Sequence, residues 1–215
     1  EVRSLMGVFG GPNKVKGGIV FSLDGANPAS YAGDSPSPIG TDYGYLGGGG
    51  NPEVSTIDRI DYSSDTPTTT AKGPLSVARY HLGAIGNTSY GYWAGGSGPI
   101  STVDRLDYSS DTTTAAAKGP LTVARYGLAG VGNKDYGYLS GGAPGPVSTI
   151  DRVDYSSDTS TASPKGPLSG TLYYTGSTGN ASYGYIGGGS PSAKTTVQRI
   201  DYGNDTATAA VKGPL

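Results

Sequence analysis

The feature that most constrains this chain is a repeat with a period of 46 or 47 residues. The tetrapeptide Lys-Gly-Pro-Leu closes four successive units, at residues 72–75, 118–121, 165–168 and 212–215. A fixed period of this length is typical of proteins in which each unit is one supersecondary structure that packs against its neighbours. We therefore expect one structural unit per repeat.

Each unit carries four further motifs in a constant order. Tyr-Gly-Tyr comes first and is followed by Gly-Gly, then by a segment ending in Asp-Tyr, then by an Asp-Thr pair. Strand-favouring residues between Gly-rich and Pro-rich turns predict four short strands, which in one unit are residues 77–86, 90–94, 101–108 and 113–118. Four antiparallel strands in about 46 residues is the size of one β-propeller blade, and no stretch has helical periodicity.

These motifs resemble the kelch repeat over residues 41–215. The resemblance lies in the Gly-Gly that closes an aromatic strand, in the Asp-Tyr that ends the next strand, and in Pro74-Leu75 followed by Arg79. The fourth strand departs from the family, because residues 115–117 are alanines where a Trp is usual. The resemblance implies an all-β fold, a single β-propeller of four-stranded blades. The repeats are also similar to Gly/Tyr-rich propeller repeats in tail-associated proteins of marine bacteriophages, which implies a virion or extracellular setting.

The first 40 residues determine the expected number of blades. Residues 3–10 align with residues 79–86, residues 18–24 resemble the end of a third strand, and residues 27–40 are loop-like. We expect one domain over residues 1–215, with repeats at about 1–40 (degenerate), 41–75, 76–121, 122–168 and 169–215, which gives five blades. The alternative is four blades with an N-terminal insertion.

Composition narrows the classes of site. The chain has no cysteine, one histidine and a formal net charge of −2. It therefore lacks a thiol nucleophile, Cys-ligated metal and the basic surface of a nucleic-acid-binding protein. No apolar run approaches the roughly 20 residues of a membrane-spanning helix. We expect no nucleic-acid partner, no membrane partner and no cofactor, and we interpret the lone His81 as incidental.

Charged residues that recur in every unit are interpreted as structural. The repeated pairs on the third strands are Arg59 and Asp61, Arg105 and Asp107, Arg152 and Asp154, and Arg199 and Asp201. An Arg–carboxylate pair in every unit suits a role in holding blades in register, and a buried pair must be fully satisfied. The aspartates of the Asp-Thr turns, at 65, 111, 158 and 205, are expected to cap those turns. Calcium at Asp61 and Asp65 is the alternative, although calcium needs six to eight oxygen ligands.

Tyr-Gly-Tyr places two rings on the same face of the second strand. Packing between blades is the favoured interpretation, because each buried aromatic ring removes about 150–250 Å² from water. A series of sugar-stacking platforms is the alternative. Trp93 stands where the other units have Leu or Ile, so we expect it in the core.

The loops between the second and third strands, here called the variable loops, are the predicted binding face. Their length and chemistry differ between units while the strands stay nearly constant, and function commonly lies on variable loops held by a rigid scaffold. The kelch resemblance also implies partner binding at this end of the disc. The candidate binding residues are Gly49, Asn51, Glu53, Ser97, Pro99, Pro144, Pro146, Ser190 and Lys194.

We expect a binding or structural module rather than an enzyme. The first strands of the units carry no Asp or Glu, so the paired carboxylates of a glycosidase are not visible near the axis; no catalytic residue and no metal ligand is predicted. The expected partner is a glycan or a protein. The alternatives are a carbohydrate-active enzyme that uses a channel-mouth acid such as Asp42 or Asp135, and a spacer without a ligand.

Overall fold

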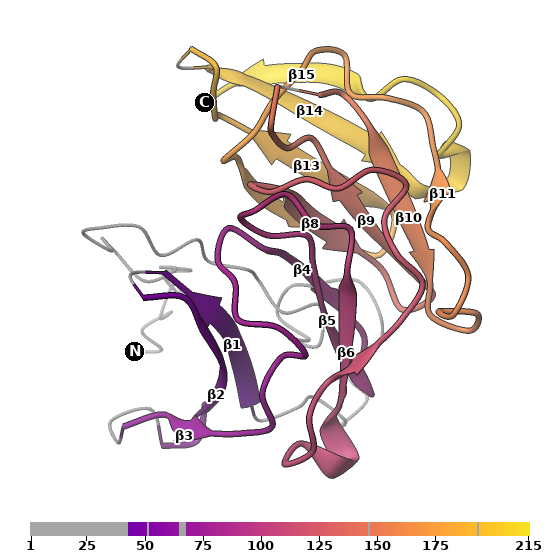
Figure 1. Cartoon of the computed structure of the whole chain (residues 1–215). Coiled ribbons are helices and arrows are strands. Elements are labelled where there is room, and N and C mark those ends of the chain that lie inside the picture. Colours follow the sequence, from indigo (N-terminus) through magenta and orange to yellow (C-terminus); the bar gives the residue numbers. More distant parts are fainter. Residues whose placement is uncertain (1–42, 51, 65–67, 146, 193) are drawn as a thin grey trace, which may run out of the picture.

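Four antiparallel sheets make up the described part of the chain (Figure 1). The computed structural model describes residues 43–50, 52–64, 68–145, 147–192 and 194–215. Residues 1–40, which decide between five and four blades, lie outside the described residues, as do Asp42, Asn51, Asp65 and Pro146.

The strands follow one another in the chain order that the repeat predicts. The first sheet contains β1 (Tyr43–Gly49), β2 (Val54–Asp61) and β3 (Thr70–Ala71). The second contains β4 (Gly83–Gly86), β5 (Tyr90–Ala94), β6 (Val103–Asp107) and β7 (Ala116–Ala117). The third contains β8 (Ala129–Gly132), β9 (Tyr136–Ser140), β10 (Ile150–Asp154) and β11 (Ser163–Pro164). The fourth contains β12 (Gly176–Gly179), β13 (Tyr183–Gly187), β14 (Thr196–Asp201) and β15 (Ala210–Pro214).

The all-β prediction is confirmed, and the outer bounds of some strands differ from those expected. The described residues include two 3₁₀ turns, η2 (Tyr108–Ser110) and η3 (Tyr202–Asn204). The strand expected over residues 77–86 is limited to β4, because the backbone of Arg79 bonds to the first sheet and His81 has a positive φ of 60°. Neither residue can continue a regular ladder. No helix in the described ranges is long and apolar enough to cross a membrane.

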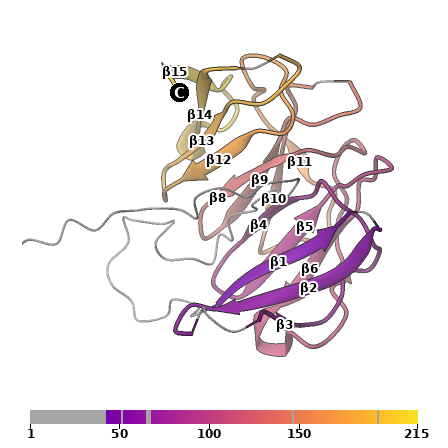
Figure 2. The same cartoon turned by 90° about the vertical axis from the view of Figure 1, so that its left-hand side faces the viewer.

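The sheets lie in series, from β1–β3 at one end to β12–β15 at the other (Figures 1 and 2). The first strands of successive sheets are neighbours: β4 packs beside β8, and β8 beside β12. This approach is close enough that a Cβ at Gly130 in β8 would overlap the carbonyl oxygen of Ala84 in β4. Glycine at that position is therefore a packing requirement.

Buried side chains lie mainly between neighbouring sheets. Between the first and second sheets the core comprises Tyr45, Ile57, Leu75, Leu82, Ala84, Trp93, Leu106 and Ala115. Trp93 is 3% exposed, which confirms its predicted place in the core. The second tyrosine of three Tyr-Gly-Tyr motifs, Tyr45, Tyr92 and Tyr138, is also buried. The packing interpretation of these rings is therefore confirmed.

The repeated Lys-Gly-Pro-Leu is explained by the junction that follows it. Gly119 N donates a hydrogen bond to the carbonyl oxygen of Asp158 in the next sheet at 2.8 Å. A Cβ on Gly119 would overlap the backbone of Ser160. Gly73 and Gly166 meet the following sheet in the same way. Only glycine allows the two backbones to come this close.

Candidate recognition face

A buried aspartate stands at each described junction between neighbouring sheets. Asp158 Oδ2 accepts hydrogen bonds from Arg105 Nη1 at 2.7 Å and from Tyr92 Oη at 2.9 Å, both in the preceding sheet. Lys118 Nζ lies 3.5 Å from the other carboxylate oxygen. Burial, reinforced by the hydrogen bond to Asp158, raises the pKa of the Tyr92 phenol, so the phenol stays protonated and donates. We call this arrangement the carboxylate cluster.

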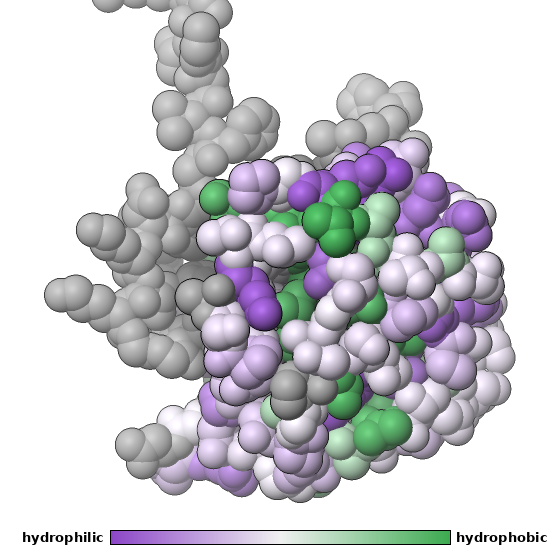
Figure 3. Space-filling model, turned by 90° about the horizontal axis from the view of Figure 1, so that it is seen from above, coloured by the Kyte–Doolittle hydropathy of each residue, from purple (hydrophilic) through white to green (hydrophobic). Residues whose placement is uncertain are grey.

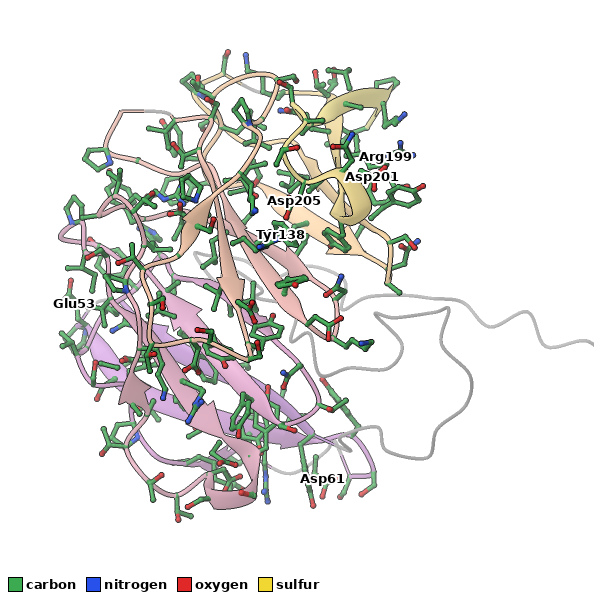
Figure 4. The ribbon with its side chains drawn as sticks, turned by 90° about the vertical axis from the view of Figure 1, so that its right-hand side faces the viewer. Glu53, Asp61, Tyr138, Arg199, Asp201 and Asp205 are labelled. Carbon is green, nitrogen blue, oxygen red and sulfur yellow. The ribbon has the colours of Figure 1, made fainter. Side chains whose placement is uncertain are left out.

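The carboxylate cluster recurs at all three junctions. Asp111 is held by Tyr45, Arg59 and Lys72, and Asp205 by Tyr138, Arg152 and Lys165. Figure 4 shows Tyr138 and Asp205 close together where the third and fourth sheets meet. Because all four groups belong to the packing between sheets, the cluster is structural.

The two sets of repeated aspartates have the opposite roles to those expected from the sequence. Asp107 Oδ1 accepts from Ser109 N at 2.9 Å and caps the turn, whereas Asp111 lies buried in the carboxylate cluster. Asp61, Asp154 and Asp201 cap their turns in the same way. Among the described residues no ion pair joins Arg59 to Asp61, Arg105 to Asp107, Arg152 to Asp154 or Arg199 to Asp201. The reason is position: the strand-end carboxylate faces solvent, and the turn carboxylate faces three donors of the preceding sheet.

Metal binding gains no support from the described residues. They contain no group of three or more His, Cys, Asp or Glu side chains that could hold a metal ion. Asp61 is occupied by its Asx turn, and the other residue of the calcium hypothesis, Asp65, lies outside the described ranges.

A second arrangement of side chains lies at the other end of the first strands of the sheets. Five aromatic residues gather where the chain enters β4, β8 and β12; they are Tyr80, His81, Tyr126, Tyr173 and Tyr174. The His81 ring lies at the centre, with its centroid 4.4 Å from that of Tyr80 and 4.7 Å from that of Tyr174. We call this set the aromatic cluster. It draws residues from three different repeats into one surface.

The backbone beneath the aromatic cluster is the same in three repeats. His81, Gly127 and Tyr174 occupy equivalent positions and have φ values of 60°, 68° and 53°. Gly127 N donates to the His81 carbonyl oxygen at 2.7 Å, and Tyr174 N donates to the Gly127 carbonyl oxygen at 2.9 Å. A left-handed conformation is uncommon for His or Tyr and concentrates at functional sites. The scaffold thus fixes the backbone while the side chain changes.

His81 and Tyr174 are also joined by a hydrogen bond. Tyr174 Oη lies 3.0 Å from His81 Nδ1. Burial lowers the pKa of His81, which favours the neutral ring that can accept from Tyr174 Oη at Nδ1. Tyr174 remains 40% exposed, so its ring offers an accessible surface beside the imidazole. The sequence analysis treats His81 as incidental, whereas the structure places it at the centre of the aromatic cluster.

Three of the predicted binding residues lie beside the aromatic cluster. Ser97 N donates to the Tyr80 carbonyl oxygen at 2.8 Å. Ser190 pairs with Tyr173 through two backbone hydrogen bonds, and Pro144 follows Ala143, which pairs with Tyr126. The variable loops of the second, third and fourth sheets and the aromatic cluster therefore form one face, which we call the loop face.

The remaining predicted residues are distributed around this face or away from it. Gly49 N donates to the Arg79 carbonyl oxygen at 3.0 Å, so its backbone is occupied at a junction between sheets. Glu53 and Pro99 are exposed and Lys194 is half-buried, and Figure 4 shows Glu53 at the side of the molecule. Asp135, named for the enzyme alternative, lies in the turn between β8 and β9, at the opposite end of the sheet from the variable loops.

The tyrosines of the aromatic cluster were missed by sequence reasoning, although a signal was present. Tyrosine recurs at one position of three repeats, directly after Arg79, Arg125 and Leu172. These tyrosines are Tyr80, Tyr126 and Tyr173. An aromatic residue that recurs at the start of a first strand marks the end of the sheet where the first strands meet. The periodic Tyr was therefore the signal that could have located the cluster.

The molecular surface offers no single dominant apolar patch in the view of Figure 3. Hydrophobic residues, in green, stand in small groups among intermediate and hydrophilic ones. Large continuous apolar patches mark many protein–protein and membrane interfaces.

Comparison with known proteins finds a similar fold in a solved structure but no matching family. No protein-family profile and no curated protein sequence matches the chain. Among solved structures the chain is similar to the structure of YjhT, with a TM-score of 0.66 at 12% sequence identity. The similarity covers 81% of this chain and 63% of that chain, so this chain spans less than two thirds of its length. At this identity the similarity concerns the fold alone.

Proposed function

We propose that the four sheets are blades of a β-propeller. Three features support the proposal: the first strands of successive sheets lie side by side, the junctions repeat residue for residue, and the chain resembles kelch repeats. The repeat period favours five blades, with residues 1–40 as a degenerate one, over four blades with an N-terminal insertion.

On this scaffold we propose a non-enzymatic recognition module that binds a neutral glycan through the loop face. The observation that carries the proposal is the aromatic cluster, in which tyrosines of three repeats surround His81. Aromatic faces stack on the C–H faces of sugars, and phenol hydroxyls and backbone groups supply hydrogen bonds. Tyrosine gives large contact area at low cost in conformational entropy, which is why recognition surfaces are rich in it. The setting we propose is a phage particle or the cell exterior.

The absence of formal charge in the aromatic cluster supports a neutral ligand. Burial raises the pKa of Tyr174, so this phenol stays neutral at neutral pH. His81 is neutral as well, because burial lowers its pKa. A charged ligand would therefore find no partner of opposite sign among these five side chains.

A glycan-array screen of the purified chain, with and without calcium, tests the proposal. We expect reproducible binding of neutral oligosaccharides that is independent of calcium and lost in Tyr174→Ala. Tyr62→Ala is the matched control, because Tyr62 is similarly exposed (48%) but belongs to the first sheet rather than to the aromatic cluster. Binding that survives Tyr174→Ala would remove the aromatic cluster as the site. No binding to any glycan would leave a protein partner or a spacer role as the better account.

A further inference from the structure

One hydrogen bond in the aromatic cluster joins side chains from two repeats that are not neighbours in the series. Tyr174 Oη, from the segment before β12, lies 3.0 Å from His81 Nδ1, in the segment before β4. Tyr174 is 40% exposed and His81 is half-buried. The bond therefore lies at the surface of the loop face, where a ligand can reach both of its members.

The glycine of the intervening repeat leaves the space that this hydrogen bond needs. A Cβ on Gly127 would lie 2.8 Å from both Cδ1 and Cε1 of Tyr174, which is closer than the Cβ of an L-residue comes to another atom. The Tyr174 ring therefore lies over Gly127 and reaches His81. Because Gly127 also bonds to the backbones of both residues, the two side chains are held in place before any ligand binds.

The chemistry of the two groups sets the direction of the hydrogen bond. Burial lowers the pKa of His81 and raises the pKa of Tyr174, so both groups are neutral at neutral pH. A neutral imidazole has one N–H donor and one bare nitrogen that accepts, and a phenol O–H is a good donor. Tyr174 Oη therefore donates to Nδ1, and the imidazole proton is on Nε2.

This arrangement offers a ligand one donor and one acceptor. Among the described residues, the His81 ring makes no hydrogen bond other than the one with Tyr174 Oη, so its Nε2–H has no partner there. Tyr174 Oη uses its proton in the bond to His81 and keeps a lone pair, so toward a ligand it is an acceptor. The donor and the acceptor are separated by little more than the width of the imidazole ring.

We propose that His81 and Tyr174 together bind two neighbouring hydroxyl groups of a neutral sugar, with Nε2–H donating to one and Tyr174 Oη accepting from the other. The inference rests on the proposed glycan binding and names the chemical feature of the glycan that is recognised. A hydroxyl group is both donor and acceptor, so a neighbouring pair satisfies both protein groups at once. A carboxylate or an ether offers only acceptors and leaves the lone pair of Tyr174 Oη unpaired.

The state of the imidazole can be measured without any ligand. His81 is the only histidine of the chain, so nitrogen-15 NMR of the labelled protein reports one imidazole ring. We expect a protonated Nε2 and a bare Nδ1 at neutral pH. Tyr174→Phe keeps the ring but removes the donor, and it should shift the Nδ1 signal, whereas Tyr62→Phe changes a tyrosine outside the aromatic cluster and should not. A proton on Nδ1 would reverse both roles and overturn the inference.

Titration of the same labelled protein with the methyl glycosides of glucose, galactose and mannose tests recognition of the hydroxyl pair. We expect the imidazole signals of His81 to move with at least one of them. Among derivatives of that glycoside that each lack one hydroxyl, two with the change at neighbouring carbons should bind about tenfold more weakly, because each leaves a polar group of the site unpaired. In Tyr174→Phe only one of these two losses should remain, since phenylalanine has no oxygen to accept from the second hydroxyl. The amide spectrum of each sample shows whether the variant is folded.

The outcomes separate this inference from the glycan binding on which it rests. Glycoside binding with the same two losses in Tyr174→Phe as in wild type would overturn the hydroxyl pair and leave glycan recognition standing. Failure of all three glycosides to bind would also overturn the inference, because each of them carries neighbouring hydroxyls. The glycan array decides the proposed function separately, since it includes larger oligosaccharides.

Discussion

The carboxylate clusters and the aromatic cluster are both products of the repeat, yet they use it in opposite ways. At the junctions the side chains are constant: an Asp with Tyr, Arg and Lys donors appears three times. In the aromatic cluster the backbone is constant and the side chain changes, from His81 to Gly127 to Tyr174. The difference separates the part of the molecule that holds sheets together from the part free to acquire specificity. Changes at junctions should therefore cost stability, and changes in the aromatic cluster should cost binding.

The largest expected effect on stability is at a buried ion pair inside the third sheet. Arg125 Nη2 lies 2.8 Å from Asp151 Oδ2, and both side chains are almost fully buried. Arg125→Leu leaves Asp151 without its cation, and we expect the free energy of unfolding to fall by about 3–5 kcal/mol in chemical denaturation.

The fourth sheet supplies the matched control for that variant. It carries Leu172 and Gln198 at the two equivalent positions, so both charges are absent together. The double variant Arg125→Leu with Asp151→Gln should therefore recover most of the lost stability. A double variant less stable than Arg125→Leu alone would show that the two residues are not coupled.

The next effect concerns the close approach of backbones at a junction. Gly119→Ala should lower the free energy of unfolding by about 1–3 kcal/mol, because a Cβ there overlaps the backbone of Ser160 and the sheets must separate. Gly213→Ala changes the equivalent glycine of the fourth sheet, where a Cβ meets no atom within 4 Å, and should have almost no effect on stability. Equal losses in the two variants would contradict the packing assigned to this junction.

A smaller effect on stability is expected in the aromatic cluster. His81→Gly introduces glycine at position 81, where the backbone is left-handed. The next repeat already has glycine at the equivalent position, Gly127. Relief of the left-handed strain, about 1–2 kcal/mol for a non-glycine residue, offsets the lost ring contacts. We expect the unfolding midpoint to stay nearly unchanged while glycan binding falls. Lost stability with unchanged binding would make His81 a packing residue.

The smallest effect is a dependence on pH. Burial lowers the pKa of His81 below its ordinary value of 6.5. Because the folded state favours the neutral ring, the contribution of His81 to stability is complete above pH 6.5 and is lost as the pH falls through the lowered pKa. Wild type should therefore lose slightly more stability than His81→Gly on acidification below pH 6.5. Parallel pH profiles of the two proteins would contradict this.

Sequence reasoning predicted the strands that are defined by local pattern. The strand expected at residues 90–94 is β5 (Tyr90–Ala94), because alternation and the flanking turns set its limits. The fourth strand, expected over residues 113–118, is reduced to Ala116–Ala117, and on its N-terminal side Ala115 N donates to Pro74 of the preceding sheet instead. Local pattern determined where a strand lies, and contact with the next sheet determined where it ends.

The roles of charged and aromatic residues were harder to predict, because they depend on contacts between repeats. Arg105 finds its carboxylate 53 residues away at Asp158 rather than two residues away at Asp107. His81 and Tyr174, 93 residues apart, meet only when three sheets are placed side by side. Spacing within one unit carries no information about such partners, whereas comparison of equivalent positions across units does.

The central claim is that recognition belongs to the loop face and not to the junctions between sheets. Isothermal titration calorimetry tests it directly, with an oligosaccharide that binds in the glycan array as the ligand and two variants of the chain. Tyr174→Ala changes the aromatic cluster, and Tyr185→Phe changes the fourth-sheet tyrosine at the repeat position of Tyr138 in a carboxylate cluster. Binding abolished by Tyr174→Ala and unchanged in Tyr185→Phe is the result that this account predicts. Binding that survives Tyr174→Ala but is lost in Tyr185→Phe would contradict it and move the recognition site to the part of the fourth sheet around Tyr185.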